Sequence, residues 1–543
     1  MSAAPESLEH SADAARRVAI RLFCRWTYRW RRRLLAWLRK NAFLRAIIVS
    51  RKIRSSRVRR SLTSAVQAVE AESAATAAGE EKHAVSTAKA VQTNSAAVEG
   101  RAASISNGPN RQQHAGGGHS PECRSEAVLP FSEPAARRYP CAMPTYQRRG
   151  EVPRKRHIQF RDNGNLLTEE VMGLEGFSGN ESILYHLISP CRVKELGDFE
   201  PIEREEWVPE AHAHRHMKTA GVEADGDAVA GRRLLMWNDD VEISLCRPAE
   251  AMESFYRNGE GDEVIFVHEG SGTLETIFGD LPYRDGDYIV VPRGTTYRFV
   301  PDGAQRYVVF ESPGLIEIPR RYRNEYGQLL EHAPYYHRDI HPPTELRTLR
   351  DRGEYRVKVR IRDGYQTYVV DYHPFDVVGW DGYVYPWTFN INDFEPITGR
   401  IHMPPPSHQT FAGRNFVICS FCPRKLDFDP LAVPIPYHHS NLNSEEMIYY
   451  VDGQFSSRKG IEIGSITLHP SGIPHGPQPG LAEKSLGATE THELAVMCDT
   501  FHPLRLSKLA KELDDGAYAY SWYEEPGETH TYDQDPAGAT SHL

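Results

Sequence analysis

The chain has 543 residues, enough for two or three domains, and 40% of them are hydrophobic, as in ordinary folded globular proteins. Its eight cysteines are too sparse for a disulfide scaffold and favour a reducing compartment, so we expect a cytoplasmic protein. Cys419 and Cys422 form the one close pair and are expected to be buried strand thiols. The net charge is -9, and no run of 18 uncharged apolar residues occurs, which excludes a transmembrane helix.

Residues 1–142 differ in composition from the rest of the chain. The first sixty residues carry 17 Lys and Arg against three acidic residues, with tryptophan and leucine interleaved. This pattern is compatible with an amphipathic helix on an anionic surface, but no nucleic-acid recognition motif accompanies it, so we expect no nucleic-acid partner. The Ala-, Ser- and Gly-rich stretch 61–118 has too little apolar surface to fold, so the extension is expected to be largely disordered. No methionine lies between Met1 and Met143, which makes Met143 the expected start of translation.

Beyond residue 142, the chain consists of short segments rich in Val, Ile, Tyr and Phe, separated by Gly, Pro, Asn and Asp. Closely spaced strands with turn signals predict an all-β fold with few helices. We expect two jelly-roll-like, cupin-like β domains, at residues 143–337 and 338–525, followed by a tail at 526–543. One helix is expected at residues 503–514, where leucines recur at helical spacing.

Two stretches of the chain follow one template, which predicts an internal duplication. The second copy contains, at fixed spacing, His439, Asn441, Glu446, Gly453, Gly464, Pro470, Gly472 and His475. The first copy contains, at the same spacing, Tyr256, Asn258, Glu263, Gly270, Gly286, Pro292, Gly294 and Tyr297. Each Pro-x-Gly element is expected to form a tight turn after a strand. Because only the second copy keeps two histidines beside the carboxylate, we expect only this copy to bind a transition metal.

His439, Glu446 and His475 are the predicted metal ligands. Two neutral imidazoles and one carboxylate leave adjacent positions of a divalent iron open for oxygen and an organic substrate. Zinc or manganese would fit the same donors. Glu445 is the alternative carboxylate, because neighbouring strand residues face opposite sides. We favour Glu446, since Glu263 stands in register with it in the first copy.

The sequence around these ligands, and the start of the folded part, carry a family resemblance. The matching segments are 149–157, 176–178, 182–186, 436–447 and 465–477. They resemble the homogentisate 1,2-dioxygenase family, in a bacterial branch of this cupin-type family, over roughly residues 143–525. The resemblance implies a non-haem Fe(II) enzyme that opens the ring of homogentisate with O2 to give maleylacetoacetate, in tyrosine and phenylalanine catabolism. It also implies a homo-oligomer, since the family forms trimers and hexamers.

The resemblance further assigns a catalytic histidine within residues 399–411. The family's active-site histidine acts on the substrate phenol, and its match is His402, with His408 as the second choice. A histidine suits this task because its ordinary pKa lies near working pH. His469 is expected to orient a ligand or to contact substrate, and His475 is expected to contact substrate as well as metal.

The substrate end of the predicted site is less complete. Arg458 or Lys459 would pair with the substrate carboxylate. Phe455 stands where better-known members of the family carry a substrate-binding tyrosine, which leaves the identity of the hydroxyarene open. A ring-cleaving cupin acting on gentisate or hydroquinone is therefore an alternative, as is a metal-binding bicupin without catalysis. The non-catalytic alternative would lack acid/base and anchoring residues near the metal, whereas residues 399–411 and Arg458 supply them.

Overall fold

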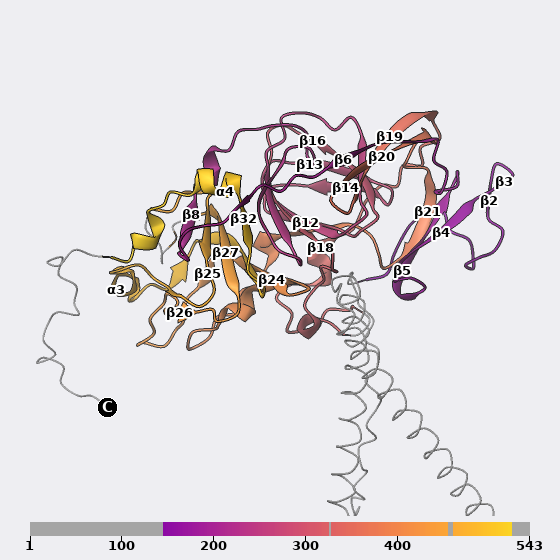
Figure 1. Cartoon of the computed structure of the whole chain (residues 1–543). Helices are drawn as coiled ribbons and strands as arrows, with labels where there is room; N and C mark the ends of the chain where they lie inside the picture. Colours follow the sequence, from indigo (N-terminus) through magenta and orange to yellow (C-terminus); the bar gives the residue numbers. More distant parts are fainter. Residues whose placement is uncertain (1–144, 325–326, 454, 456–459, 524–543) are drawn as a thin grey trace, which may run out of the picture. The chain divides into compact units, whose positions relative to one another are not determined.

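The computed structural model describes residues 145–324, 327–453, 455 and 460–523, and these are built mostly of β-strands (Figure 1). Their two α-helices are short, α3 (Leu481–Ser485) and α4 (Lys508–Leu513). Short 3-10 turns are η1 (Thr219–Gly221), η2 (Arg320–Tyr322), η3 (His337–Asp339), η4 (Ile391–Asp393), η5 (Pro405–His408) and η6 (Tyr518–Tyr520). The predicted all-β fold with few helices is confirmed. The extension 1–142, Met143 and the tail 526–543 lie outside the described residues.

The first copy of the template lies in two large sheets. The nine-stranded sheet contains, in spatial order, β18 (Ile340–His341), β22 (Trp387–Asn390), β15 (Asp287–Val291), β12 (Asp262–Glu269), β17 (Arg306–Ser312), β10 (Glu242–Cys246), β9 (Arg232–Trp237), β32 (Arg505–Ser507) and β7 (Glu206–Trp207). The seven-stranded sheet contains β14 (Gly279–Tyr283), β13 (Gly272–Thr276), β16 (Thr296–Pro301), β11 (Phe255–Asn258), β19 (Arg352–Ile361), β20 (Gly364–Tyr372) and β6 (Glu195–Pro201).

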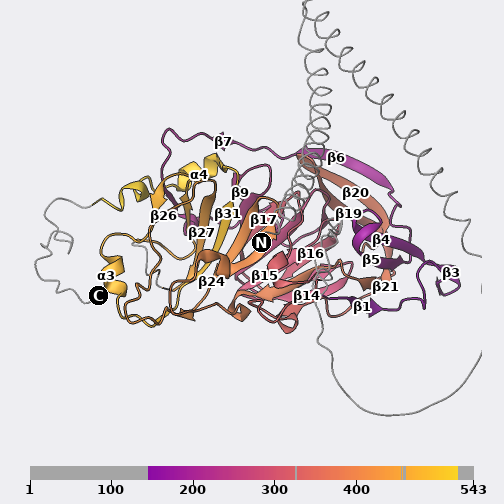
Figure 2. The same ribbon diagram turned by 90° about the horizontal axis from the view of Figure 1, so that it is seen from below.

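The second copy lies in a six-stranded sheet, whose central strands run side by side in Figure 2. Its spatial order is β23 (Gln409–Gly413), β24 (Phe416–Phe421), β31 (Leu494–Thr500), β27 (Glu445–Asp452), β28 (Ile466–His469) and β8 (Arg215–Met217). Two strand pairs complete it, β25 (Arg424–Lys425) with β30 (Glu490–Thr491), and β26 (His439–Ser440) with β29 (Pro474–His475).

The remaining strands form two small sheets. The four-stranded sheet contains β1 (Gln147–Gly150), β21 (Val377–Gly382), β5 (Ser178–His186) and β4 (Thr168–Glu175). β2 (Arg161–Asp162) pairs with β3 (Asn165–Leu166). None of the helices in the described part of the chain is long and apolar enough to cross a membrane.

Central strands of both copies bury both faces. On β12, Ile265 and Val267 pack with the apolar interior of the first copy, whereas Val264 and Phe266 face a second core. This follows from the two-residue period of a strand, because every position of the run is apolar and neighbours point to opposite faces. Burial of each large apolar side chain stabilises the fold by about 1.5–3 kcal/mol.

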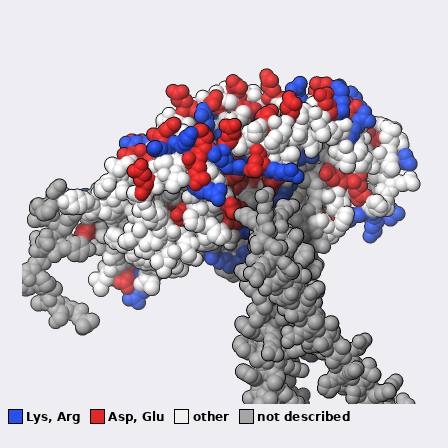
Figure 3. Space-filling model, in the orientation of Figure 1, with Lys and Arg blue, Asp and Glu red and all other residues white. Residues whose placement is uncertain are grey.

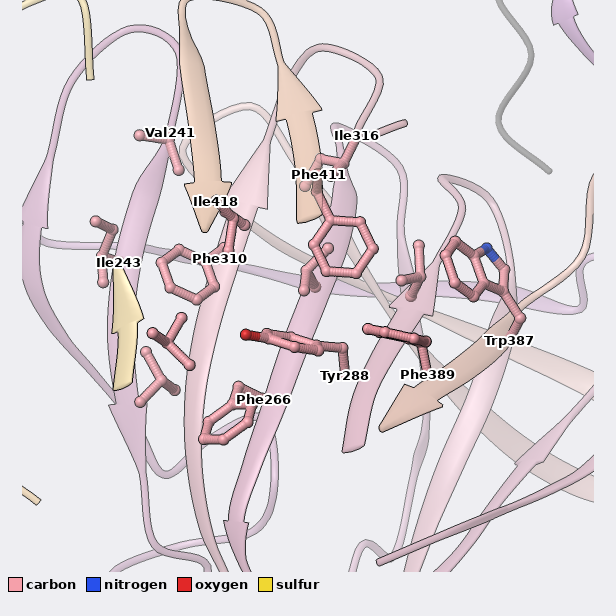
Figure 4. Packing of buried hydrophobic residues seen from close by; sticks show 14 of the residues in the cluster. Val241, Ile243, Phe266, Tyr288, Phe310, Ile316, Trp387, Phe389, Phe411 and Ile418 are labelled. Atoms are coloured by element: carbon pink, nitrogen blue, oxygen red, sulfur yellow. The ribbon is translucent and has the colours of Figure 1, made fainter. Parts of the chain in front are cut away.

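The second core is shared by the two copies. Tyr288 of β15 meets the ring of Phe411 of β23 at 5.2 Å, and its hydroxyl lies 2.8 Å from Ser420 Oγ of β24. Figure 4 shows Phe411 and Ile418 of the second copy among the side chains of the first. The copies therefore pack directly against one another.

Strand pairing extends the first copy past the predicted boundary at 337/338. β19 pairs in parallel with β11, and β22 pairs with β15, so the pairing continues to Asn390. The two copies also exchange strands. β8, from early in the chain, pairs with β28 of the second copy, while β32, from late in the chain, pairs with β9 of the first.

The helix expected at residues 503–514 is shorter than its leucine pattern indicates. Residues Arg505–Ser507 extend the nine-stranded sheet, and α4 begins only after Ser507, whose hydroxyl accepts the N–H of Ala510 at 3.1 Å. A serine at this position satisfies a free N–H of the first turn, which favours helix initiation here. Cys419 and Cys422 are buried and free, as predicted, but only Cys419 lies in a strand, since β24 ends before Cys422.

Candidate metal centre

His439, Glu446 and His475 lie together in the second copy. β26 pairs with β29 so that His439 stands opposite His475, and Glu446 is the second residue of β27. One ligand atom from each residue lies within 4.8 Å of the others. The turn before His475 depends on Gly472, whose φ of +82° suits glycine and whose N–H donates to the Asn441 carbonyl at 2.7 Å.

Strand alternation separates the two candidate carboxylates. Glu446 Oε1 lies 3.4 Å from His475 Nε2, and Glu446 Oε2 lies 3.6 Å from His439 Nε2. Glu445 faces away, and its carboxylate accepts the backbone N–H of Leu504 at 2.7 Å. The structure thus points Glu446 at the two histidines and gives Glu445 a separate partner.

The cluster has the properties of a cation site. Burial raises the pKa of Glu446, but its interactions with His439, His469 and His475 outweigh burial and hold the pKa well below its usual value. His475 is buried, and neither ring nitrogen has a hydrogen-bond partner among the described residues. An unpaired buried polar group costs about 1–3 kcal/mol. Two nitrogens and one carboxylate oxygen fit Fe(II), Zn(II) or Mn(II), and such an ion would satisfy one ring nitrogen of His475.

A second carboxyl group lies beside the cluster. Asp499 of β31 stands opposite Glu446 in the sheet register. Burial, and then the charge of Glu446, raise the pKa of Asp499 to about 8, although His439 lowers it in part. Two buried carboxyl groups side by side disfavour each other's ionised form, and a bound cation would relieve this repulsion.

His469 lies behind Glu446. Its Nδ1 is 2.8 Å from Glu446 Oε1 and its Nε2 is 3.1 Å from the Tyr518 hydroxyl, and its ring stacks on that of His475 at 4.4 Å. These contacts suit a residue that orients a ligand. Neither His469 nor His475 is among the described residues that line the adjacent cavity, so the structure does not place them as the sequence-predicted substrate contacts.

A cavity of about 90 Å³ adjoins the cluster and is lined by His439, Glu446 and both candidate catalytic histidines, His402 and His408. A cavity of this size suits one small molecule. Its apolar and aromatic lining includes Met403, Phe421, Ile448, Tyr450, Phe455 and Met497. The predicted anchors Arg458 and Lys459 lie outside the described residues.

The two candidate catalytic histidines differ in their surroundings. His402 Nδ1 lies 3.5 Å from Asp427 Oδ2, and its ring meets Tyr437 at 5.1 Å. His408 is buried, and its Nδ1 has no hydrogen-bond partner in the described part of the chain. Burial, followed by the charges of Arg424 and His402, lowers the pKa of His408 to about 3. His408 is therefore neutral at neutral pH and a weak base.

Several residues near the centre were not foreseen from the sequence. The ring of His214 meets those of His469 at 5.5 Å, His475 at 5.8 Å and Trp522 at 5.1 Å. His214 precedes β8 and lies far from the second copy in sequence, so no motif could connect it with the ligands. Arg424 also lines the cavity. Its only sequence signal is a cation placed just after a buried strand.

In the first copy, an arginine contacts the three positions that correspond to the ligand set. Arg232 Nη1 lies 2.7 Å from Glu263 Oε1, and Arg232 Nη2 donates to the Tyr297 hydroxyl at 2.9 Å. Its guanidinium carbon lies 5.4 Å from the centroid of the Tyr256 ring. Arg232 Nη1 also lies 3.1 Å from Glu311 Oε1. A cation from the protein itself thus stands where the second copy would hold a metal ion.

The fold and the site together define a mostly β protein built on two copies of one template, and in the described part of the chain a His–Glu–His cluster is found in the second copy. Two family models match the chain, Homogentisate 1,2-dioxygenase N-terminal over residues 226–391 and Homogentisate 1,2-dioxygenase C-terminal over residues 391–526. Their junction coincides with the end of β22 at Asn390. The chain belongs to the homogentisate 1,2-dioxygenase family.

Individual relatives differ in how closely they match. A protein named "Putative dioxygenase" from Saccharolobus solfataricus is 44% identical over 381 residues, which cover 70% of this chain and 99% of the relative. The homogentisate 1,2-dioxygenase of Sinorhizobium fredii is 24% identical over 408 residues, covering 67% of this chain and 87% of the relative. That of Rhizobium etli CIAT 652 is 26% identical over 287 residues, which cover 49% of this chain and 61% of the relative. A cupin 2 conserved barrel protein from Leptotrichia buccalis aligns with 10% identity and a TM-score of 0.24 over 54% of this chain and 98% of its own.

Proposed function

We propose that this protein is a non-haem Fe(II) dioxygenase that converts homogentisate and O2 into maleylacetoacetate, in the breakdown of tyrosine and phenylalanine. The observation that carries the proposal is the convergence of His439, Glu446 and His475 beside a small, aromatic-lined cavity. Membership of the homogentisate 1,2-dioxygenase family supports the reaction class.

Each part of the site has a role in this reaction. A ferrous ion bound by His439, Glu446 and His475 would supply open coordination positions and the redox chemistry for O2. His469 fixes the orientation of the Glu446 carboxylate through its 2.8 Å contact. The apolar wall excludes water and holds the aromatic ring in one orientation, which replaces a bimolecular encounter by a positioned one.

His402 is the residue that we assign to accept the phenolic proton. His402 lines the cavity, and Asp427, 3.5 Å from Nδ1, can hold the ring in position. His408, with a pKa of about 3, accepts a proton poorly and is better suited to a hydrogen bond with the substrate as a neutral imidazole.

Oxygen uptake tests the proposal. The purified protein, loaded with Fe(II) in the presence of ascorbate, is offered homogentisate, gentisate and hydroquinone in separate reactions. We expect the largest kcat/KM with homogentisate and a product with the absorbance of maleylacetoacetate. Faster turnover of gentisate or hydroquinone would reassign the substrate, in keeping with Phe455. Uptake with none of the three would leave a metal-binding bicupin without this activity.

We also propose that the chain works in the cytoplasm as a homo-oligomer. The described cysteines are free, which supports a reducing compartment. Large apolar side chains are exposed between β25 and β27, with Leu431 90% and Leu442 81% exposed, and the surface over β25 and β26 is largely uncharged in Figure 3. Such a surface suits contact with further copies of the chain. Sedimentation velocity of the full chain tests this, and a monomer at micromolar concentration would contradict it.

A further inference from the structure

The cavity contains a charged pair, Arg424 and Glu493, to which the proposed reaction has so far given no role. Arg424 Nη2 lies 3.1 Å from Glu493 Oε1, and Nη1 donates to the carbonyl of Cys422 at 3.1 Å. The guanidinium also lies 5.9 Å from the centroid of the Phe421 ring. Both charged side chains are mostly buried, with 12% and 15% exposed. These contacts hold the guanidinium in one place in the cavity wall.

Strand register places this pair at the other end of the cavity from the metal centre. Glu446, Ile448 and Tyr450 alternate onto the cavity face of β27, and Ala495 of β31 stands opposite Tyr450. Neighbours on one face of a strand are about 6.6 Å apart, so Tyr450 lies about 13 Å along the strand from Glu446. Glu493 precedes Ala495 by two residues and lies beyond this row. β25, which carries the arginine, pairs with β30 on the same side.

The distance between the two ends suits one substituted aromatic ring. The backbone positions of the metal-binding glutamate and of the charged pair are separated by about 13 to 20 Å along the sheet. Ile448, Tyr450 and Met497 line the space between them and present apolar surface to a ring.

The charges in the cavity favour an anionic ligand. With a divalent cation at the metal centre, the charged residues that line the cavity, Glu446, Glu493 and Arg424, leave it with a net positive charge, since Asp499 is not part of this lining. The field of Arg424 acts inside the cavity, because after burial it is the next cause that lowers the pKa of His408. Its hydrogen bonds to Glu493 and Cys422 use only part of the guanidinium's N–H groups.

We propose that Arg424 is a specificity-determining residue that binds the carboxylate of a hydroxyaryl acid, while Glu493 holds the guanidinium in position. The ring hydroxyl end of the substrate then faces His439, Glu446 and His475. This assignment rests on the proposed function and places the carboxylate contact on β25 instead of at Arg458. The substrate class is a hydroxyarene with a short anionic side arm.

Two variants in one strand test this assignment. Arg424→Gln removes the charge in the cavity, and Lys425→Gln removes the neighbouring charge, which is 72% exposed and pairs with Glu490. We expect Arg424→Gln to raise KM for homogentisate roughly 10- to 100-fold, the range for loss of a charge-assisted hydrogen bond. Turnover of hydroquinone, which lacks the carboxylate, should change less than about 3-fold. Lys425→Gln should leave both unchanged, and Arg424→Lys should restore part of the affinity.

A binding measurement separates this proposal from the catalytic one. Calorimetric titration of the Fe(II) protein with 4-hydroxyphenylacetate, without O2, requires no turnover. Weaker binding to Arg424→Gln than to the wild type, with unchanged thermal unfolding, supports the carboxylate contact even if no ring cleavage is observed. Equal affinity of the two proteins, or an equal loss with hydroquinone and homogentisate, overturns it. A selective loss of homogentisate in Arg458→Gln, with Arg424→Gln unaffected, also overturns it.

Discussion

The two copies of the template surround the same glutamate position with different partners. In the first copy the positive charge of Arg232 belongs to the chain and meets Glu263 at 2.7 Å. In the second copy, Glu446 is surrounded by histidines, and under the proposed function a metal ion from solution supplies the positive charge. In the first copy, an arginine of the chain neutralises the buried glutamate, which gives this copy a structural role. In the second copy, the proposed metal ion would keep coordination positions open for substrate and oxygen.

The charge states of the groups that contact Arg232 are fixed across the physiological pH range. Burial raises the pKa of Glu311, but the charges of Arg232 and Arg360 outweigh it and lower the pKa. Burial also raises the pKa values of Tyr256 and Tyr297 well above their usual range. The Glu311 carboxylate therefore stays charged, and the phenols of Tyr256 and Tyr297 stay neutral. A metal ion that entered this copy would have to displace the guanidinium of Arg232.

Loss of a histidine ligand should have the largest effect. We expect His475→Ala or His439→Ala to lower bound iron to background and to reduce oxygen uptake by roughly a thousandfold or more, because the remaining donors no longer form a closed set. Tyr297→Phe, at the matching position of the first copy, should retain iron. Metal analysis after gel filtration measures both, and full iron in His475→Ala would refute the assignment.

Removal of the internal cation should destabilise the first copy strongly. Arg232→Met leaves Glu263 and Glu311 buried without their shared partner, and we expect the free energy of unfolding to fall by about 3–5 kcal/mol. Denaturant unfolding of the full chain measures this. Arg233→Gln is the matched control, since that side chain is 45% exposed and pairs with Asp225. A change below about 1 kcal/mol in Arg232→Met would contradict the role of this arginine.

A titratable internal cation lies outside both copies, at His186 of β5. Its ring contacts Asp376 at 2.7 Å and Glu170 at 2.9 Å. Burial alone would lower its pKa, but these two carboxylates raise it from 6.5 to about 9. A raised pKa in the folded state means that the stabilisation is complete below pH 6.5 and is lost as the pH rises through 9.

We therefore expect stability to fall at alkaline pH, by about 3 kcal/mol more in the wild type than in His186→Gln. Urea unfolding at pH 6 and above pH 9 measures the difference. His157→Gln serves as the control, because His157 is 97% exposed and meets Glu169 at 3.2 Å. Parallel pH profiles for the wild type and His186→Gln would show that His186 carries no such charge. Arg232 does not titrate in this range, so the stability lost in Arg232→Met should not change with pH in the same way.

A smaller effect is expected from the residue behind the ligand carboxylate. His469→Gln should weaken iron binding by roughly 10- to 100-fold, because Glu446 loses a partner that orients it. Glu445→Gln, one position from the ligand, should alter iron binding by less than about 2-fold. Competition with a chelator of known affinity measures both values. Equal losses in the two variants would mean that Glu445 also takes part in the site.

The ligand cluster of the second copy could be predicted because its residues lie close together in the sequence. Histidines and a glutamate at fixed spacing on paired strands indicated a cluster, and the turn at Gly472 explained how His475 returns to it. The choice of Glu446 over Glu445 followed from register with Glu263. Short runs of β-branched and aromatic residues between turn residues were sufficient to predict strands, because such runs fit a sheet that is buried on both faces.

What could not be predicted depends on contacts between distant segments. Arg232 reaches Glu263 and Glu311 across strands, and no spacing rule connects an arginine on β9 with a template on β11 and β12. The pairing of β19 with β11 likewise places residues after 338 in the first copy. The helix at 503–514 was predicted too long, since edge pairing of Arg505–Ser507 competes with helix formation.

The exchange of strands limits where this protein can be cut into independently folding fragments. β8 completes the sheet that carries Glu446, and β32 completes the sheet that carries Glu263, so each half borrows backbone hydrogen bonds from the other. If the chain were cut between the two copies, both fragments would expose unpaired strand backbone, which promotes aggregation. A chimera that exchanges one copy between homologues should fold only if β8 or β32, whichever pairs with that copy, is exchanged together with it.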